Sequence, residues 1–409
     1  MRVINQEQLK AILSNYTNNP RIIASGNFAA PKVLLAAADE VIPEFRLHML
    51  NAHDGIPDRE GIAYETAFVG PAMRRHPRLN YFPARLSMLP VIIREHLHPD
   101  IVFLHTSAPR FDTVSLGIEV NVLPMAIETA QAHGGLVIAQ ANKQMPYTYG
   151  DAQLYESEID YLVEVDEPLL HKEQIPISDT AQEIGNRIAA LISDNSTLQL
   201  GIGAVPDAVL SCLKDRSGMR IWTEMFSDGV LDLYKTGVLD KEVLLTASFL
   251  FGSPELYEWV NLNKLVRMRR TERTNDPSQI ARQARMTSIN AALEIDLFDQ
   301  ANASHVRGEI YSGFGGSTDF IVGALHSRGG ASFMALPSWH PKANVSTIVP
   351  NIGSNITSFQ HSYVVTEQGV ATCFGKSQSE QANNLVEQAA HPNAKEALRD
   401  SARKLNLLK

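Results

Sequence analysis

One carboxylate in this 409-residue chain has neighbours that could turn it into a reactive group. It is Glu224, in RIWTEMFSDGVLDLYKTG (residues 220–237). The stretch reads as a short apolar strand, a turn, and a helix that begins near Ser227 or Asp228 and ends at Gly237. In α/β proteins, reactive groups gather where a strand passes into a helix. For a lone Glu in this position, a solvated turn residue or a first-turn charge favoured by the helix dipole is the simpler interpretation.

Two glycine turns could bind an anion or an oxyanion, because such turns expose backbone N–H groups and let a ligand approach closely. GIGAVPD (residues 201–207) lacks the third glycine of the dinucleotide fingerprint and has no GK[ST], so a plain tight turn is the simpler interpretation. GFGGSTDF (residues 313–320) has three glycines in four positions. That density is typical of a ligand site with converging N–H groups, and also of a β-bulge.

Other chemistries find little support in the chain. There is no HExxH metal motif, no GxSxG and no convincing Cys/His pair, so we expect no metal. Cys212 and Cys373 are too few for a disulfide framework or a zinc site and are interpreted as buried thiols. VRMRRTERTNDPSQIARQAR (residues 266–285) carries six arginines, which could meet phosphates or form a solvated or subunit-facing surface.

Composition and charge restrict the class of protein. Hydrophobic residues make up 44% and charged residues 20%, as in globular proteins, and the net charge of −9 argues against nucleic acid as a partner. No apolar run is long enough to span a bilayer, and the first residues turn polar before a signal-type core develops. We therefore expect a cytoplasmic protein without a membrane association.

The elements that must position Glu224 alternate between strands and helices. Continuous apolar runs at residues 100–106 and 135–140 predict strands covered on both faces, with a helix over 123–134 between them. Such alternation predicts α/β domains with mostly parallel sheets. Because the length exceeds one ordinary core, we expect two domains, 1–167 and 179–409, joined by a proline-containing linker at 168–178.

The second half contains further predicted elements. Asp179 with Gln182 has capping-box spacing and predicts a helix to about Ile192, and residues 207–213 are expected to be helical. SYVVTEQGVA (residues 362–371) predicts a closing strand, and residues 377–408 are mostly helix with an interruption at the His391 and Pro392 pair.

Taken together, these motifs resemble the acetyl-CoA hydrolase/transferase family of class I CoA-transferases, closest to its 4-hydroxybutyrate CoA-transferase branch. The resemblance covers nearly the whole chain. It rests on RLNYFPARLSMLP, DIVFLHTSAPRFDTVSLG, NKQMPYTYGD, LQLGIGAVPDAVL, TEMFSDG, ASFLFGS, TNDPSQIAR, INAALEIDLF, GFGGSTDF, VVTEQGVA and AHP, in this order and spacing.

The resemblance implies two tandem open α/β domains of CoA-transferase type with the active site in the cleft between them. Glu224 falls on the family's catalytic glutamate, which forms a thioester with CoA. The N–H groups of Ile202 and Gly316 fall on oxyanion-hole positions, and Asn275 falls on a residue that binds the thioester oxygen. The glycine turns are accordingly expected to contribute to CoA binding, through the four glycines Gly201, Gly203, Gly315 and Gly316.

The chain departs from the family pattern at several positions that concern substrate contacts. Arg110 and Thr113 stand where an aspartate and a glycine are usual, which indicates a different wall of the acyl pocket. Two arginines expected near the end of the chain are replaced by Gln381 and Lys395, and the usual Leu-Arg-Gly after VVTEQGVA reads Cys373-Phe374-Gly375.

The expected reaction moves CoA from an acyl-CoA to a short-chain carboxylic acid such as acetate, butyrate or 4-hydroxybutyrate, by a ping-pong mechanism through a glutamyl-CoA thioester. At its ordinary pKa of about 4.3, Glu224 would be fully charged at neutral pH and would need oxyanion donors to attack a thioester. CoA is then a substrate, no tightly bound cofactor is needed, and a homodimer or homotetramer is expected. An acyl-CoA hydrolase using the same residues and a CoA-binding protein without turnover are the alternatives.

Overall fold

The computed structural model describes residues 1–172, 176–201, 203–353, 356 and 361–408. The chain forms two compact units, each assembled from separate segments. The first unit contains Met1–Glu173, Leu244–Thr274 and Ile310–Gly315, and the second contains Gln174–Val243, Asn275–Glu309 and Gly316–Lys409. The first break falls inside the predicted linker at 168–178, but the two later insertions into the first unit differ from the contiguous domains expected from the sequence.

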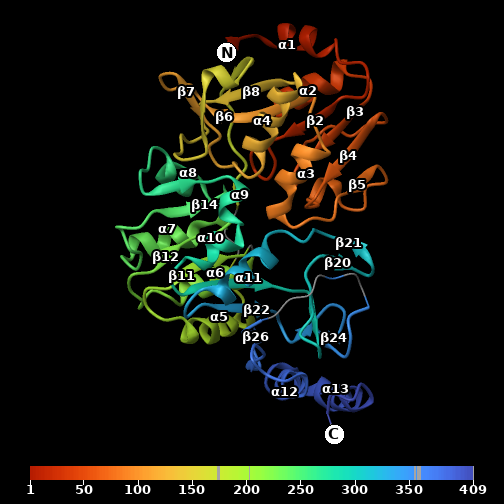
Figure 1. Cartoon of the computed structure of the whole chain (residues 1–409), viewed down its shortest axis with the longest axis vertical. Coiled ribbons are helices and arrows are strands. Elements are labelled where there is room, and N and C mark those ends of the chain that lie inside the picture. Colours follow the sequence, from red (N-terminus) through yellow and green to blue (C-terminus); the bar gives the residue numbers. More distant parts are fainter. Residues whose placement is uncertain (173–175, 202, 354–355, 357–360, 409) are drawn as a thin grey trace. The chain divides into compact units, whose positions relative to one another are not determined.

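An eight-stranded sheet organises the first unit, in the order β1-β10-β8-β6-β2-β3-β4-β5. All neighbouring strands in it are parallel. Figure 1 labels β2, β3, β4, β5, β6 and β8. Its strands are β1 (Arg2–Val3), β2 (Arg21–Ala24), β3 (Phe45–His48), β4 (Ile62–Thr66), β5 (Leu79–Tyr81), β6 (Ile101–Ser107), β8 (Leu136–Asn142) and β10 (Tyr161–Val165). Every residue of β6 is buried, as the continuous apolar run predicts for a strand covered on both faces.

The first unit also contains helices. They are α1 (Gln6–Leu13), α2 (Lys32–Val41), α3 (Leu89–Glu95), α4 (Leu123–His133), α8 (Pro254–Val260) and α9 (Thr271–Thr274), with 3₁₀ turns η1 (Pro71–Met73), η2 (Leu86–Met88) and η3 (Glu156–Glu158). Of these helices, α1, α2 and α4 pack on this sheet. The remaining strands are short: β7 (Thr113–Ser115), β9 (Gln153–Tyr155), β14 (Leu245–Ala247), β15 (Phe249–Leu250), β16 (Val266–Met268) and β21 (Glu309–Ile310). The apolar faces of α1 and α2 pack into a cluster with β2, β3 and β4 that includes Leu34, Phe45 and Tyr64.

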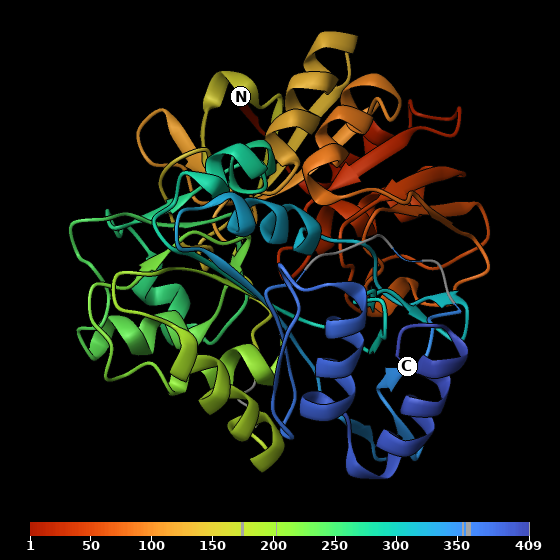
Figure 2. The same ribbon diagram turned by 60° about the horizontal axis from the view of Figure 1, so that its bottom comes forward.

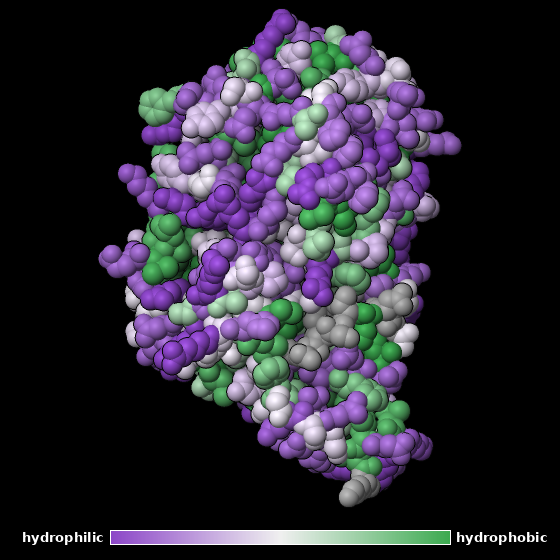
Figure 3. Space-filling view, in the orientation of Figure 1, coloured by the Kyte–Doolittle hydropathy of each residue, from purple (hydrophilic) through white to green (hydrophobic). Residues whose placement is uncertain are grey.

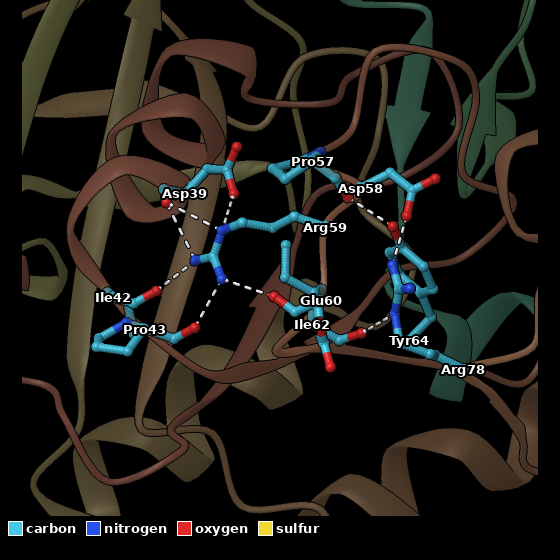
Figure 4. A network of polar contacts seen from close by, with 10 residues as sticks. All are labelled: Asp39, Ile42, Pro43, Pro57, Asp58, Arg59, Glu60, Ile62, Tyr64 and Arg78. Atoms are coloured by element: carbon cyan, nitrogen blue, oxygen red, sulfur yellow. Dashed lines mark hydrogen bonds and ion pairs between the residues drawn. The ribbon is translucent and has the colours of Figure 1, made fainter.

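Two arginines fix the loop between β3 and β4 (Figure 4). Arg59 donates to the Asp39 carboxylate at 2.7 Å and to the carbonyl oxygens of Ile42 and Pro43, which tie the loop to the end of α2. Arg78 donates to the carbonyl of Ile62 at 2.8 Å and pairs with Asp58. The loop therefore has a fixed path although it has no regular secondary structure.

A six-stranded sheet organises the second unit, in the order β12-β11-β17-β22-β26-β27. The strands are β11 (Thr197–Leu200), β12 (Arg220–Ile221), β17 (Met286–Ala291), β22 (Ala331–Ala335), β26 (Tyr363–Val365) and β27 (Val370–Thr372). Its pairs are parallel except for β26 and β27, which form an antiparallel hairpin. The predicted closing strand over 362–371 is thus two strands, because the chain turns between Thr366 and Gly369.

The helices of the second unit include those that flank the candidate site. They are α5 (Asp179–Leu191), α6 (Ala204–Ser211), α7 (Asp228–Lys235), α10 (Pro277–Ala281), α11 (Ser317–His326), α12 (Gln378–Asn384), a π-helical turn η4 (Leu385–Ala389) and α13 (Pro392–Lys404). Short strands complete it: β13 (Met225–Phe226), β18 (Glu294–Asp296), β19 (Ala301–Asn302), β20 (His305–Val306), β23 (Trp339–His340), β24 (Val345–Ser346) and β25 (Ile348–Val349). The two C-terminal helices, in blue, lie side by side in Figures 1 and 2, with the predicted interruption at His391 and Pro392.

Some predicted helix boundaries differ from the structure. Ser178, not Asp179, caps α5, because its hydroxyl accepts from the N–H of Ala181. Helix α6 begins at Ala204 rather than at Asp207, so Pro206 lies within its first turn, where a missing N–H costs nothing. The α/β fold with mostly parallel sheets is confirmed in both units.

Polar residues predominate on the face shown in Figure 3, with apolar residues in separate groups. Among the described residues, none of the helices has both the length and the apolar character needed to cross a bilayer.

Candidate active site

Glu224 is held between β12 and β13 by the residues on either side of it. The N–H of Trp222 donates to the carbonyl of Leu198, which continues the pairing of β12 with β11. The hydroxyl of the buried Thr223 accepts from the N–H of Leu200 at 3.1 Å and lies 2.8 Å from the carbonyl oxygen of Met225. The backbone on both sides of Glu224 is therefore fixed to the carboxyl end of the sheet.

Helix α7 follows as the sequence predicts, with Ser227 at its N-cap and Gly237 just beyond its end at φ +79°. The Ser227 hydroxyl does not cap its own helix. It donates instead to Oδ1 of Asp207 in the first turn of α6, at 3.1 Å. This contact joins the glycine turn before α6 to the segment that carries Glu224.

Asn275 and Gly316 meet Glu224 at the same carboxylate oxygen. Nδ2 of Asn275, a fully buried residue, donates to Oε2 of Glu224 at 2.7 Å. A Cβ atom at Gly316 would lie 2.0 Å from that Oε2 and 2.2 Å from Nδ2 of Asn275. Gly316 is also the N-cap of α11, whose first N–H groups lack partners within the helix. The structure thus brings together three of the residues that the resemblance assigns to the site.

Glu224 has a raised pKa, which corrects the expectation of an ordinary carboxylate. Burial of its carboxyl group raises the pKa to about 7, the hydrogen bond from Asn275 opposes the rise, and the negative charge of Asp319 adds to it. Asp319 is itself buried, in the first turn of α11. At neutral pH Glu224 is therefore divided between its charged and neutral forms.

The other predicted glycine positions are less closely tied to Glu224. Ile202 lies outside the described residues. Gly203 is the N-cap of α6 at φ +127°, a conformation that side-chain-bearing residues rarely adopt. Gly315, at φ +58°, belongs to the first unit, where a Cβ would lie 3.2 Å from the ring of Phe68. Gly201 donates its N–H to the carbonyl of Ile289 at 3.1 Å.

Sequence reasoning gave no role to Thr223 and Asp319, although both lie inside quoted motifs. It also missed a buried polar cluster on the neighbouring strands β11 and β17. Ser288 donates to Oε1 of Gln199 at 2.7 Å, and Nδ2 of Asn290 donates to Ser288 Oγ at 2.8 Å. Polar residues at alternate positions of an otherwise apolar strand were the available signal.

The arginine run at residues 266–285 is largely engaged within the protein. Arg270 pairs with Glu128 at 2.6 Å and with Glu272 at 2.7 Å. Arg273 lies 3.4 Å from Asp151, and Arg285 donates to a backbone carbonyl at 3.0 Å. A phosphate or subunit contact by this run remains a prediction, and Arg270 is committed to its two carboxylates.

Gln381 and Lys395, which replace family arginines, have structural partners. Nε2 of Gln381 donates to the carbonyls of Cys373 and Lys376, and Nζ of Lys395 donates to the carbonyl of Glu387 at 2.6 Å. Cys373 is fully buried as expected, whereas Cys212 is partly exposed, because it lies at the end of α6. No cluster of three potential metal ligands occurs among the residues that the structure describes.

Comparison with known proteins places the chain in a family. The chain is 35% identical over 96% of its length to the 4-hydroxybutyrate coenzyme A transferase of Clostridium kluyveri, of which it covers 96%. The chain belongs to the acetyl-CoA hydrolase/transferase family. The profile of the acetyl-CoA hydrolase/transferase C-terminal domain matches residues 252–402.

Solved structures support membership of the acetyl-CoA hydrolase/transferase family across both units. RipA from Yersinia pestis superposes with a TM-score of 0.92 at 28% identity, covering 99% of this chain and 98% of RipA. A 4-hydroxybutyrate CoA-transferase from Porphyromonas gingivalis gives a TM-score of 0.82 at 30% identity with the same coverage. The resemblance inferred from the motifs is therefore confirmed at the level of family and fold.

Proposed function

We propose that this protein is an acyl-CoA:carboxylate CoA-transferase in which Glu224 carries CoA between two carboxylic acids. The observation that carries the proposal is the arrangement of Asn275 and Gly316 around one oxygen of Glu224. A donor at 2.7 Å and a residue position with no room for a side chain are what a site needs to bind a developing oxyanion. The full-length similarity to a 4-hydroxybutyrate coenzyme A transferase supports the reaction class.

In the first half-reaction, an oxygen of ionised Glu224 attacks the thioester carbonyl of the acyl-CoA. The C–S bond breaks, CoA leaves as a thiolate, and a mixed anhydride joins the acyl group to Glu224. The thiolate then attacks the Glu224 side-chain carbonyl, so the acyl group departs as a free acid with the bridging oxygen. The product is a glutamyl-CoA thioester, and a second acid reverses these steps to leave as the new acyl-CoA.

The hydrogen bond at Oε2 supports different roles for the two carboxylate oxygens. Asn275 donates to Oε2, so this oxygen is the one that remains as the carbonyl of the glutamyl thioester. The other oxygen attacks and leaves with the product acid. One donor aimed at a developing oxyanion supplies about 3 to 4 kcal/mol of transition-state stabilisation.

The raised pKa of Glu224 suits this role. A carboxylate removed from water is less stabilised in its charged form, and it is therefore a stronger nucleophile than an exposed glutamate. The disadvantage is that in some of the molecules Glu224 is protonated at neutral pH and cannot attack the thioester. Acetate, butyrate and 4-hydroxybutyrate with their CoA esters are the proposed substrates, and a screen of short-chain acyl-CoAs against these acids defines the preferred pair.

Hydrolysis is the second candidate, since the family includes hydrolases and the residue Glu224 as a whole is partly exposed although its carboxyl group is buried. Water that attacks the anhydride or the thioester would release CoA without an acceptor. Rates with and without a carboxylate acceptor separate the two activities. A cytoplasmic location, a homodimer or homotetramer and the absence of a tightly bound cofactor stay predictions.

The decisive experiment traps the glutamyl thioester. The protein incubated with acyl-CoA and no acceptor should lose activity on addition of borohydride or hydroxylamine, with the mass change confined to the peptide that contains Glu224. Glu224→Gln should abolish transfer and labelling while CoA binding persists. Full activity in this variant, or a label on another peptide, would reject the proposal.

A further inference from the structure

The first unit contains a cavity of about 560 Å³ at the carboxyl ends of three neighbouring strands, β6, β8 and β10. Its walls come from Ser107 and the residues after it, from the segment after β8, from the segment after β10, and from α8 with the turn that follows. Ligands of parallel sheets bind at this edge. The volume lies within the range of small-molecule sites.

Positively charged side chains line this cavity from two separate segments. They are Arg110 after β6 and Lys143 directly after β8, and the imidazole of His171, after β10, also lines it. Glu258 of α8 is the acidic residue in the wall, and Asp166 lies 3.9 Å from Nζ of Lys143. Within the described residues Arg110 makes no ion pair, so its charge is available to a ligand, in a protein whose net charge is −9.

Arg110 is held in place by its backbone. Its N–H donates to the carbonyl of Thr113 at 2.7 Å, and the Thr113 hydroxyl donates to the carbonyl of Arg110 at 3.0 Å. The same hydroxyl lies 2.7 Å from the OH of Tyr147, a buried residue of the cavity wall. Arg110 and Thr113 are the two residues that replace an aspartate and a glycine of the family pattern, and their contacts hold the backbone from which the exposed Arg110 side chain extends.

The rest of the wall is apolar and aromatic. Met145, Pro146 and Leu169 contribute hydrocarbon surface, and Tyr147 and Tyr257 contribute rings whose hydroxyls are engaged elsewhere in the unit. A short-chain acid would fill only a small part of this volume. Two cations, Arg110 and Lys143, in an apolar, ring-bearing wall suit a ligand with more than one anionic group and a flat aromatic body.

A strained residue forms part of the same wall. Leu262 has φ +57°, a left-handed conformation that a leucine rarely adopts. Its N–H donates to the carbonyl of Tyr147 at 2.8 Å, and the side chain of neighbouring Asn261 accepts from the N–H of Tyr147 at 2.9 Å. Backbone strain maintained by surrounding contacts is characteristic of binding sites.

We propose that this cavity binds the phosphate groups and base of an adenosine phosphate, with Arg110 and Lys143 as the phosphate-binding cations. This chemistry is shared by free nucleotides and by the nucleotide end of CoA. The proposal does not depend on the thioester chemistry of Glu224.

Isothermal titration of the full-length protein with adenosine 3′,5′-bisphosphate tests the proposal, with ADP as a second probe and butyrate as a control. We expect saturable binding of the bisphosphate with one site per chain. Arg110→Glu should weaken binding of the bisphosphate at least tenfold, and the double variant that also carries Lys143→Glu should show no saturable binding. Lys214→Glu makes the same charge change at an exposed lysine of the second unit and should leave affinity unchanged.

Thermal unfolding of each variant establishes that it is folded. If Arg110→Glu is not folded, the milder variant Arg110→Gln replaces it in the titration. No saturable binding to the wild type, or equal affinity in the folded Arg110 variants, would overturn the proposal. If the cavity binds the nucleotide end of CoA, the bisphosphate competes with acyl-CoA and Arg110→Glu raises the KM for acyl-CoA. If the cavity binds a free nucleotide, the bisphosphate does not compete with acyl-CoA and the KM for acyl-CoA is unchanged in Arg110→Glu. Glu224→Gln should bind the bisphosphate with wild-type affinity. Failure of the proposed function of Glu224 can therefore be distinguished from failure of nucleotide binding at this cavity.

Discussion

Gly316 stands so close to Glu224 that a methyl group on it would lie 2.0 Å from Oε2. The same methyl would lie 2.2 Å from Nδ2 of Asn275. Both atoms are the ends of side chains, so a substitution displaces the two functional groups and leaves the backbone in place. We therefore expect substitutions at Gly316 to affect turnover more than folding.

Gly316→Ala should reduce turnover at least about tenfold, because it breaks the hydrogen bond between Asn275 and Glu224. The free energy of unfolding should change by less than about 1 kcal/mol, since the flexible ends can move. Steady-state rates and denaturant unfolding measure the two effects. A folded variant with wild-type turnover would remove Gly316 from the site.

The pH dependence of kcat/KM should follow ionisation of Glu224. In the proposed mechanism Glu224 must be charged to attack, so kcat/KM should rise about tenfold per pH unit below pH 7 and level off above it. Asp319→Asn removes a negative charge that raises this pKa, and should move the midpoint to lower pH. An unchanged midpoint in the folded variant would show that Asp319 does not act on Glu224.

Glu224→Gln should stabilise the protein at alkaline pH. The pKa is raised from 4.5 to about 7 in the folded state, so folding favours the protonated acid, and stability is lost as pH rises through this window. Gln cannot ionise and so does not carry the cost of a buried negative charge. After allowance for partial exposure, the free energy of unfolding should be about 2 kcal/mol higher in Glu224→Gln at pH 8. Denaturant unfolding at pH 8 and pH 4 measures it, and an equal gain at both pH values would contradict this cause.

Two buried histidines should make the first unit sensitive to acid. Burial lowers the pKa of His48 and of His105 from 6.5 to about 4. Their neutral forms stabilise the fold fully above pH 6.5, and this stability is lost as pH falls towards 4, by about 3 kcal/mol each. Near His48, Glu65 opposes the shift and Arg21 adds to it.

The variant His48→Met tests this prediction, because within the described residues neither ring nitrogen of His48 has a hydrogen-bond partner. Its unfolding free energy should fall less between pH 6.5 and 4 than that of the wild type. The exposed His96→Gln should retain wild-type sensitivity. Parallel pH curves for His48→Met and the wild type would contradict the assignment.

Local patterns predicted the elements around Glu224 well. The apolar pair at residues 221–222, the turn and Gly237 defined a short strand followed by a helix, and the structure has both. These signals are local, since caps and periodicity depend on residues a few positions apart. The meeting of Glu224 with Asn275, 51 residues away, came only from the family resemblance.

The charge state of Glu224 could not be predicted in the same way. Its pKa depends on removal from water and on Asp319, which sits in another helix. The discontinuous first unit was missed for a similar reason. Residues 244–274 show the usual strand and helix pattern, and only tertiary hydrogen bonds, such as Leu250 N–H to the carbonyl of Ile118, place them there.

That discontinuity limits how genes of this family can recombine productively. A single crossover at the predicted linker would replace the second half of the chain, including Leu244–Thr274 and Ile310–Gly315. The first unit of the chimaera would then combine strands from one parent with α8 and its turn from the other. Each parent must supply matching partners for contacts such as that between Asn261 and Tyr147. Exchange of one whole unit requires several breakpoints, so substrate preference in this family is expected to change by point substitution more readily than by shuffling.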